Sequence, residues 1–90
     1  MTKPEIRVLW GCNMLALALL DHGVQCAICF PLGEAPCVRI PGVELLEAIA
    51  TDADRYEVWS LGEVTEAVPL RLDLSITETV DFLSQFEGRA

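Results

Sequence analysis

The sequence predicts a small α+β fold, in which a single-layer mixed or antiparallel sheet of four to five strands packs against two or three helices. Three observations support this fold class. The chain has 90 residues, which suffices for one hydrophobic core, so we expect residues 1–90 to form a single domain. With 52% hydrophobic and 22% charged residues, its composition is that of a folded chain. Its apolar residues follow the strand period in some segments and the helix period in others.

The segment before residue 24 contains the first strand and the first helix. Glu5 to Trp10 alternates between apolar and more polar residues, which is the period of a half-buried strand. Gly11 would end that strand. Asn13 is then a candidate N-cap for a helix over residues 14–22, and Gly23 suits the left-handed turn that closes a helix. In a second interpretation residues 14–20 form a strand and residues 21–23 a hairpin turn, and the sequence leaves both open.

Val24 to Phe30 is the apolar segment with the strongest strand character, and we expect it to be the central strand of the sheet. Prolines and a glycine predict a loop over residues 31–36, followed by a short strand or extended link over residues 37–40. Pro41 suits the first turn of a helix. The sequence therefore predicts a helix from Pro41 to about Thr51, with a polar turn over residues 51–54.

The last third of the chain is predicted to be a β-hairpin followed by a helix. Tyr56 to Leu61 forms its first strand, Gly62-Glu63 the turn, and Val64 to Leu74 the second strand. Pro69 indicates that this second strand lies at an edge or carries a bulge. Ser75-Ile76-Thr77-Glu78 has the signature of a capping box, and the helix that it opens would end at Gly88.

Four cysteines are the candidate chemical groups of this chain. Cys26-Ala27-Ile28-Cys29 resembles the opening of a RING zinc domain over these four residues, and Cys37 with Cys12 or His22 could complete a tetrahedral zinc site. No cysteine or histidine follows Cys37, whereas a RING domain needs further pairs. The alternation of a strand also places Cys26 and Cys29 on opposite faces. We therefore expect reduced structural thiols, and no metal or other cofactor.

The segment from Val8 to Ile28 resembles the start of glutaredoxin-like and thioredoxin-like domains, with a strand, Trp-Gly-Cys, a helix rich in leucine and alanine, and a second strand. The resemblance implies a thiol redox activity with Cys12 as nucleophile at a helix N-terminus, where the helix dipole would lower the pKa of its thiol. Leu15 stands at the resolving position. A thioredoxin-like thiol redox or zinc-binding module is thus the alternative function, using Cys12, Cys26, Cys29 and Cys37.

The acidic residues are concentrated in the second half of the chain. The net charge is −8, and ten of the 14 acidic residues lie in residues 46–90 beside three basic ones. Such a charge distribution repels nucleic-acid phosphates and anionic membranes and attracts basic partners. The acids form either an ordinary solvated surface or a docking surface for a basic protein. The candidate docking residues are Glu44, Glu47, Asp52, Asp54, Glu63, Glu66, Glu78, Asp81 and Glu87.

These features predict a small acidic protein-interaction module without enzymatic activity. Its expected partner is a basic protein, which could itself bind nucleic acid, as for small inhibitors, antitoxins and anti-defence proteins. We expect no direct nucleic-acid binding, because the negative charge repels phosphates. We also expect no membrane contact, because the apolar run from Met14 to Leu20 is far shorter than the roughly 20 residues that cross a bilayer. We expect a cytoplasmic protein, and an unpaired sheet edge would allow a homodimer.

Overall fold

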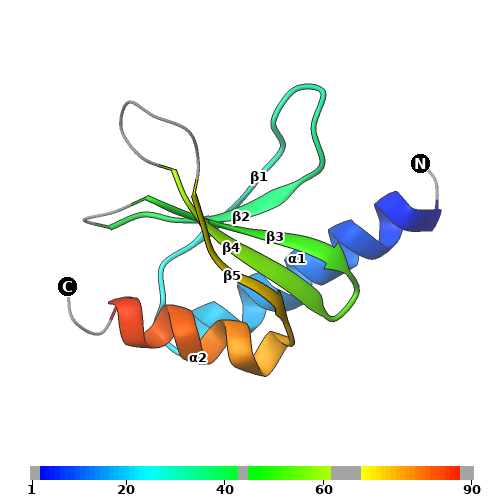
Figure 1. Cartoon of the computed structure of the whole chain (residues 1–90). Helices are drawn as coiled ribbons and strands as arrows, with labels where there is room; N and C mark the ends of the chain where they lie inside the picture. Colours follow the sequence, from blue (N-terminus) through cyan, green and yellow to red (C-terminus); the bar gives the residue numbers. More distant parts are fainter. Residues whose placement is uncertain (1–2, 43–44, 62–67, 88–90) are drawn as a thin grey trace.

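The fold is a five-stranded antiparallel sheet with two helices. A computed structural model describes residues 3–42, 45–61 and 68–87, and their side chains from residue 6 to residue 86. The elements are α1 (Lys3–Asp21), β1 (Ala27–Cys29), β2 (Cys37–Ile40), β3 (Leu46–Asp52), β4 (Arg55–Ser60), β5 (Val68–Leu74) and α2 (Ile76–Glu87). The strand order is β1-β2-β3-β4-β5, so each strand pairs with the next along the chain (Figure 1). The predicted fold class is confirmed.

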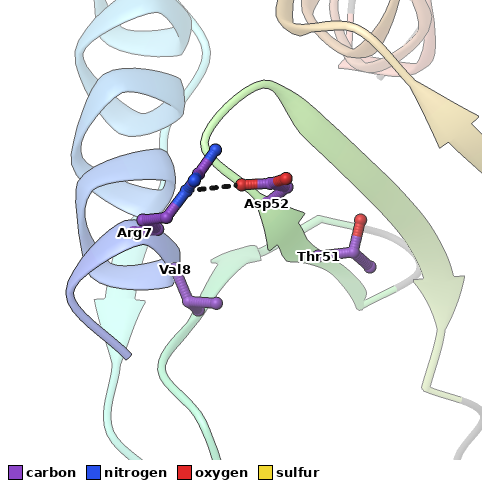
Figure 2. A pocket seen from close by; sticks show the side chains of 4 residues that line it. All are labelled: Arg7, Val8, Thr51 and Asp52. Carbon is purple, nitrogen blue, oxygen red and sulfur yellow. Dashed lines mark ion pairs between the residues drawn. The ribbon is translucent and has the colours of Figure 1, made fainter. Parts of the chain in front are cut away.

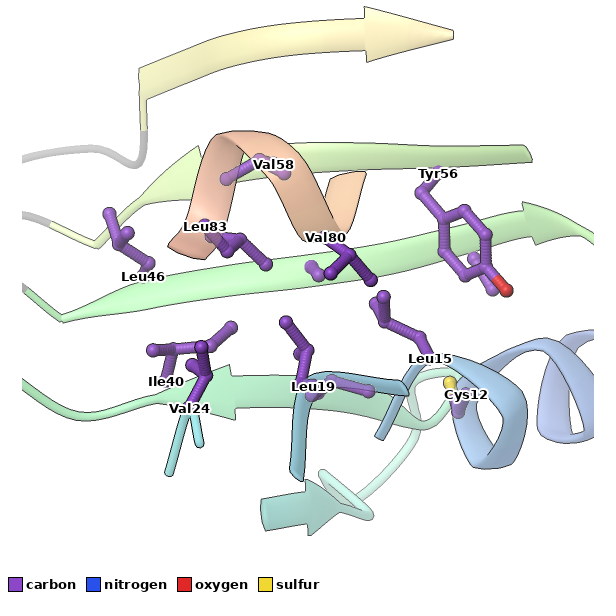
Figure 3. Close-up of a cluster of buried hydrophobic side chains, with 13 residues drawn as sticks. Cys12, Leu15, Leu19, Val24, Ile40, Leu46, Tyr56, Val58, Val80 and Leu83 are labelled. Atoms are coloured by element: carbon purple, nitrogen blue, oxygen red, sulfur yellow. The ribbon is translucent and has the colours of Figure 1, made fainter. Parts of the chain in front are cut away.

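The hydrophobic core lies between one face of the sheet and the two helices (Figure 3). Leu15 and Leu19 of α1 and Leu83 of α2 are fully buried in one cluster with side chains of the sheet. In β3 the buried residues Leu46, Ala48 and Ala50 alternate with residues of the other face. Both helices therefore cover the same face, and no helix among the described residues lies on the other face.

The first expected strand is wrong, because Glu5 to Trp10 belongs to α1, which runs without a break from Lys3 to Asp21. The alternation over a few residues masked a longer helical pattern, in which Val8, Cys12, Leu15 and Leu19 recur at three- and four-residue spacing and face the core. For residues 14–21 the helical interpretation is confirmed and the strand interpretation is wrong.

Two glycines shape α1 in different ways. Gly11 does not end an element but permits a close approach to the sheet, since a Cβ atom there would lie 3.0 Å from Ala50 Cβ and 3.0 Å from the Asp52 carbonyl oxygen. Gly23 closes the helix as expected, with a φ of 77°. The Val24 N–H then donates to the Leu19 carbonyl oxygen at 2.9 Å, which satisfies one of the last free carbonyls of α1.

The expected central strand is also wrong. Of Val24 to Phe30, only residues 27–29 form a strand, and β1 lies at the edge of the sheet, antiparallel to β2. Phe30 is 69% exposed, while Val24 alone in this segment is buried. The central position belongs to β3, which pairs with β2 and β4. The loop before residue 37 and the strand at residues 37–40 are confirmed.

The helix expected from Pro41 to Thr51 is wrong as well, since residues 46–52 form β3. Leu46, Ile49 and Ala50 fit a helical spacing, but the burial of residues 46, 48 and 50 shows the strand period. On the other face of β3, Glu47 and Ile49 are half-buried and Thr51 is exposed, so this strand has one buried face and one partly solvated face. Of the turn expected over residues 51–54, residues 53–54 form the turn, whereas residues 51 and 52 belong to β3.

The C-terminal hairpin and helix are confirmed within the described residues. β4 pairs with the edge strand β5, and the register of their pairing shifts twice, as Pro69 indicated. The capping box is present: the Ser75 N–H donates to Glu78 Oε1 at 2.9 Å, and the Glu78 N–H donates to Ser75 Oγ at 3.2 Å. These bonds hold the pKa of the Glu78 carboxyl below its usual value. The expected turn at Gly62-Glu63, residues 64–67 and the closure at Gly88 lie outside the described residues.

Candidate functional site

The outer face of α1 carries a continuous apolar stripe. Its residues follow one another at three- and four-residue spacing, which places them on one side of the helix. Their exposed fractions range from 40% at Met14 to 65% at Leu17, and Trp10 is 60% exposed. We call this set the outer stripe; it consists of Ile6, Trp10, Met14, Leu17 and Leu20.

Large apolar side chains on both faces are unusual for a helix that covers a sheet. Such a helix normally buries one apolar side and presents charged residues to water on the other. On α1, from residue 6 onward, the charged residues are Arg7 and Asp21 alone. Each Å² of apolar surface left in water forgoes about 25 cal/mol. An exposed row of this kind makes the outer face of α1 a candidate binding surface.

Acidic residues border the outer stripe on the side of α2. A shallow groove of about 160 Å³ separates the two helices, and the exposed carboxylate of Asp81 stands at its rim. Its remaining lining residues are Ala18, His22, Ile76, Thr77 and Val80. The His22 Nδ1–H donates to the Ala18 carbonyl oxygen at 2.9 Å, which holds the imidazole against the end of α1. The groove thus has an apolar floor and polar rims.

The turn between β3 and β4 continues this acidic border toward the N-terminus of α1. Arg7 Nε lies 2.8 Å from Asp52 Oδ1, beside a hollow of about 260 Å³ that Val8 and Thr51 also line (Figure 2). Asp54 Oδ1 accepts a hydrogen bond from the Ile76 N–H at 3.0 Å, which joins the turn to the start of α2. The turn and α2 therefore follow α1 along the same side.

The predicted docking residues are found in separate places. Four of them belong to two segments that the Asp54–Ile76 hydrogen bond joins: Asp52 and Asp54 lie at the end of β3 and in the turn after it, and Glu78 and Asp81 lie on α2. Glu47 lies away from them on the uncovered sheet face, where its Oε2 is 3.5 Å from Arg39 Nε. Glu44, Glu63 and Glu66 lie outside the described residues, and Glu87 is the last residue of α2, with a side chain that is not described.

Most of the acids that come together also support the local fold. Asp52 pairs with Arg7, Asp54 accepts a hydrogen bond from the first N–H of α2, and Glu78 belongs to the capping box. All four are exposed, and Asp81 is the one that has none of these three structural roles. Fewer carboxylates are therefore available to a partner than the sequence suggests, and the one without a structural role, Asp81, lies at the groove beside α1.

The uncovered face of the sheet has a wide hollow of about 390 Å³. Across it, Arg39, Glu47 and Trp59 lie side by side on β2, β3 and β4. The Trp59 indole N–H donates to Glu57 Oε1 at 3.2 Å, and Arg39 pairs with Glu47. Arg39 Nε is buried there without a hydrogen bond, so its contact with Glu47 is an ion pair only.

The surroundings of the cysteines do not match the alternative thiol site considered from the sequence. Cys12 lies in the middle of α1 and is fully buried, so its expected place at a helix N-terminus is wrong. Burial raises the pKa of the Cys12 and Cys26 thiols. Burial, aided by the nearby charge of Glu47, raises the pKa of Cys37 to about 11. Catalytic and metal-binding cysteines need a lowered pKa, so these environments favour the inert protonated thiol.

The four cysteines are free and spread over different elements. Cys26 donates to the Ala16 carbonyl oxygen at 3.7 Å on α1, whereas Cys29 stands opposite Cys37 in the sheet. Within residues 3–42, 45–61 and 68–87 there is no group of three or more His, Cys, Asp and Glu side chains that could hold a metal ion.

Sequence reasoning missed the outer stripe, because it assigned Ile6 and Trp10 to a strand and so divided the helix in two. A helical projection of residues 3–21 would have revealed two apolar sides, which is the pattern of a helix buried all round. The available signal was therefore the absence of any charged residue over residues 8–20.

Comparison with known proteins returns no relatives: no protein-family model matches the chain, and no curated protein or solved structure is significantly similar to it. The described helices include none that is long and apolar enough to span a membrane. The functional argument thus depends on the residues themselves.

Proposed function

We propose that this protein is a non-enzymatic interaction module that binds a basic protein through the outer stripe and the acidic residues beside it. The observation that carries the proposal is the row of five large apolar side chains with exposed fractions of 40–65%. Protein interfaces are built around such an apolar centre, with aromatic and methionine side chains enriched and a polar rim around it. Trp10 and Met14 provide such side chains, and Asp81 belongs to the rim.

The net charge of −8 supports a basic partner rather than nucleic acid or an anionic membrane. Small inhibitors, antitoxins and anti-defence proteins are the class that fits this size and charge. The free thiols are compatible with a reducing compartment, so the proposal places the protein in the cytoplasm. The raised thiol pKa values at Cys12, Cys26 and Cys37 speak against the thiol-dependent alternative.

Affinity capture with matched variants tests this function. The tagged protein, the double variant Trp10→Ser/Leu17→Ser and the control Leu32→Ser are incubated with extract of the source cells at low and high salt. Leu32 is fully exposed on the β1–β2 loop and lies outside the outer stripe, so its variant controls for the loss of an exposed apolar side chain. We expect a basic protein to bind the wild type and the control, to be lost with the double variant, and to elute as salt screens the charges.

The proposal is wrong if captured proteins bind the double variant as well as the wild type, or if they resist high salt. Circular dichroism of each variant confirms that the fold is retained. Truncation of exposed side chains changes the free energy of unfolding by about 0.5 kcal/mol or less, so a folding defect is not expected.

A further inference from the structure

We infer that the partner presents one amphipathic α-helix, which lies along α1 and carries Lys or Arg on the side turned toward α2. This inference rests on the proposed function and specifies the partner element that the outer stripe binds. Three properties of the described surface lead to it: the shape of the stripe, the condition of the sheet edges, and the unequal charge on its two sides.

The outer stripe has the length and spacing of a helix-binding ridge. From Ile6 to Leu20 it extends about 21 Å at 1.5 Å per residue, or about four helical turns. Side chains at three- and four-residue spacing form ridges that fit between the ridges of another helix. A partner helix with apolar residues at the same spacing would cover the stripe along its whole length.

The sheet edges are less suited to binding an extended segment. At one edge β1 has three residues, which offers few backbone groups for pairing. At the other edge Pro69 removes a backbone donor from β5, and Asp73 has a φ of 56°, which interrupts the extended backbone. Strand addition is thus disfavoured at both edges, and the exposed apolar surface of α1 is left as the main contact.

The two sides of the outer stripe differ in charge. On the side of α2 lie the Arg7–Asp52 pair, Asp54 at the turn and Asp81 at the groove, so the described acids outnumber the bases. On the other side, the Cys26 thiol donates to the Ala16 carbonyl oxygen, and the segment from residue 24 to residue 30 carries no charged residue. A basic row on one side of a partner helix would therefore meet acids only when it faces α2.

Synthetic helical peptides of about 18 residues test this inference directly. All share one apolar stripe of leucines; the first has Lys along one side and Gln on the other, the second has Lys on both sides, and the third has Glu on one side. The variant Trp59→Phe leaves Trp10 as the sole tryptophan, so its fluorescence reports on the stripe. We expect the first peptide to shift Trp10 emission to shorter wavelength and to bind about 10-fold more tightly than the Glu peptide. The second peptide, with Lys on both sides, should bind less than about threefold more tightly than the first, because its second row of Lys meets no acids.

Two protein variants locate the binding surface. Trp10→Ser/Leu17→Ser should lower the affinity for the first Lys peptide by about 30-fold or more, measured by calorimetry. Truncation of a central aromatic side chain and its neighbour removes the apolar contact. Asp81→Lys should lower the same affinity about fivefold or more at low salt and less at high salt. Glu34→Lys makes the same change of charge on the exposed β1–β2 loop, away from the stripe, and should alter binding less than twofold.

Three outcomes overturn the inference. The first is equal binding of the Lys and Glu peptides, and the second is equal loss of affinity with Asp81→Lys and Glu34→Lys. The third is a dimer of the protein alone in sedimentation analysis that Trp10→Ser/Leu17→Ser dissociates, because the stripe would then bind a second copy. If the peptides fail while a captured basic protein still depends on Trp10 and Leu17, the helical partner is refuted and the proposed function stands.

Discussion

The two faces of α1 have similar residues and opposite surroundings. Leu15 and Leu19 on the inner face are fully buried against the sheet, whereas Leu17 and Leu20 on the outer face are 65% and 52% exposed. The same residue type thus serves a core on one side and a free surface on the other. Both faces of α1 are thus apolar enough to pack against another surface. The tertiary fold buries one of them and leaves the other exposed.

The largest difference in the free energy of unfolding is expected between two leucine variants, one on each face of α1. Leu15→Ala should lower the free energy of unfolding by about 2–5 kcal/mol, because it leaves a cavity under the helix. Leu17→Ala should lower it by about 0.5 kcal/mol or less, because its side chain contacts mainly water. Urea unfolding followed by circular dichroism measures both. Similar losses for the two variants would mean that the outer face also supports the fold.

A smaller change in the free energy of unfolding is expected at Gly11, the glycine on the inner face of α1. Gly11→Ala should cost about 1–3 kcal/mol from crowding against Ala50 and the Asp52 carbonyl oxygen, offset by up to about 1 kcal/mol of helix propensity. Adding Ala50→Gly removes one of the two crowded atoms and should restore part of the loss, measured by the same unfolding experiment. A stabilising Gly11→Ala would show that the helix can move away from the sheet at no cost.

The smallest effect concerns the protonation of the buried thiols and of Tyr56. Burial raises the pKa of Cys37 from 9.0 to about 11 and that of Tyr56 from 10.0 to about 12. The unfolded chain releases the Cys37 proton between pH 9 and about 11, and the Tyr56 proton between pH 10 and about 12, while the folded chain retains them, so the free energy of unfolding should fall as pH rises through these intervals. For Cys37 the loss between pH 8 and pH 10 is about 1 kcal/mol.

Unfolding of the wild type and of Cys37→Ala at pH 8 and pH 10 measures this loss. The variant should lose less stability over this interval, because it lacks one of the groups that titrate. An equal loss in both proteins would exclude Cys37 as a source, and a gain of stability at pH 10 would contradict the direction of all these shifts. Each protein serves as its own reference at pH 8.

The sequence predicted the fold class and the elements whose local signals are complete. Ser75 and Glu78 bond each other in the capping box, Pro69 lies on an edge strand, and Gly23 has the left-handed conformation that a helix end requires. Each of these features depends on residues that are close in sequence. Local physical rules therefore suffice for them.

The errors concern segments whose pattern fits two periods. Glu5 to Trp10 alternates as a strand would, and residues 46–50 also fit a helix, so only the packing of the whole chain decides between these structures. The same holds for the candidate site. The acids Asp52 and Asp81 were predicted, but their places beside α1 depend on the Arg7–Asp52 pair and on the packing of α2 against α1, which no local pattern encodes.

The strand order has a consequence for how fast the chain folds. Because every strand pairs with its successor, the sheet can form by adding one hairpin after another, and no strand must wait for a distant segment. The docking of α1 onto β3, where residues 11 and 50 meet, is by contrast a contact between segments that are distant in the chain. A newly synthesised chain would have both apolar faces of α1 exposed until β3 emerges, and a partner bound to the inner face in that interval would delay folding.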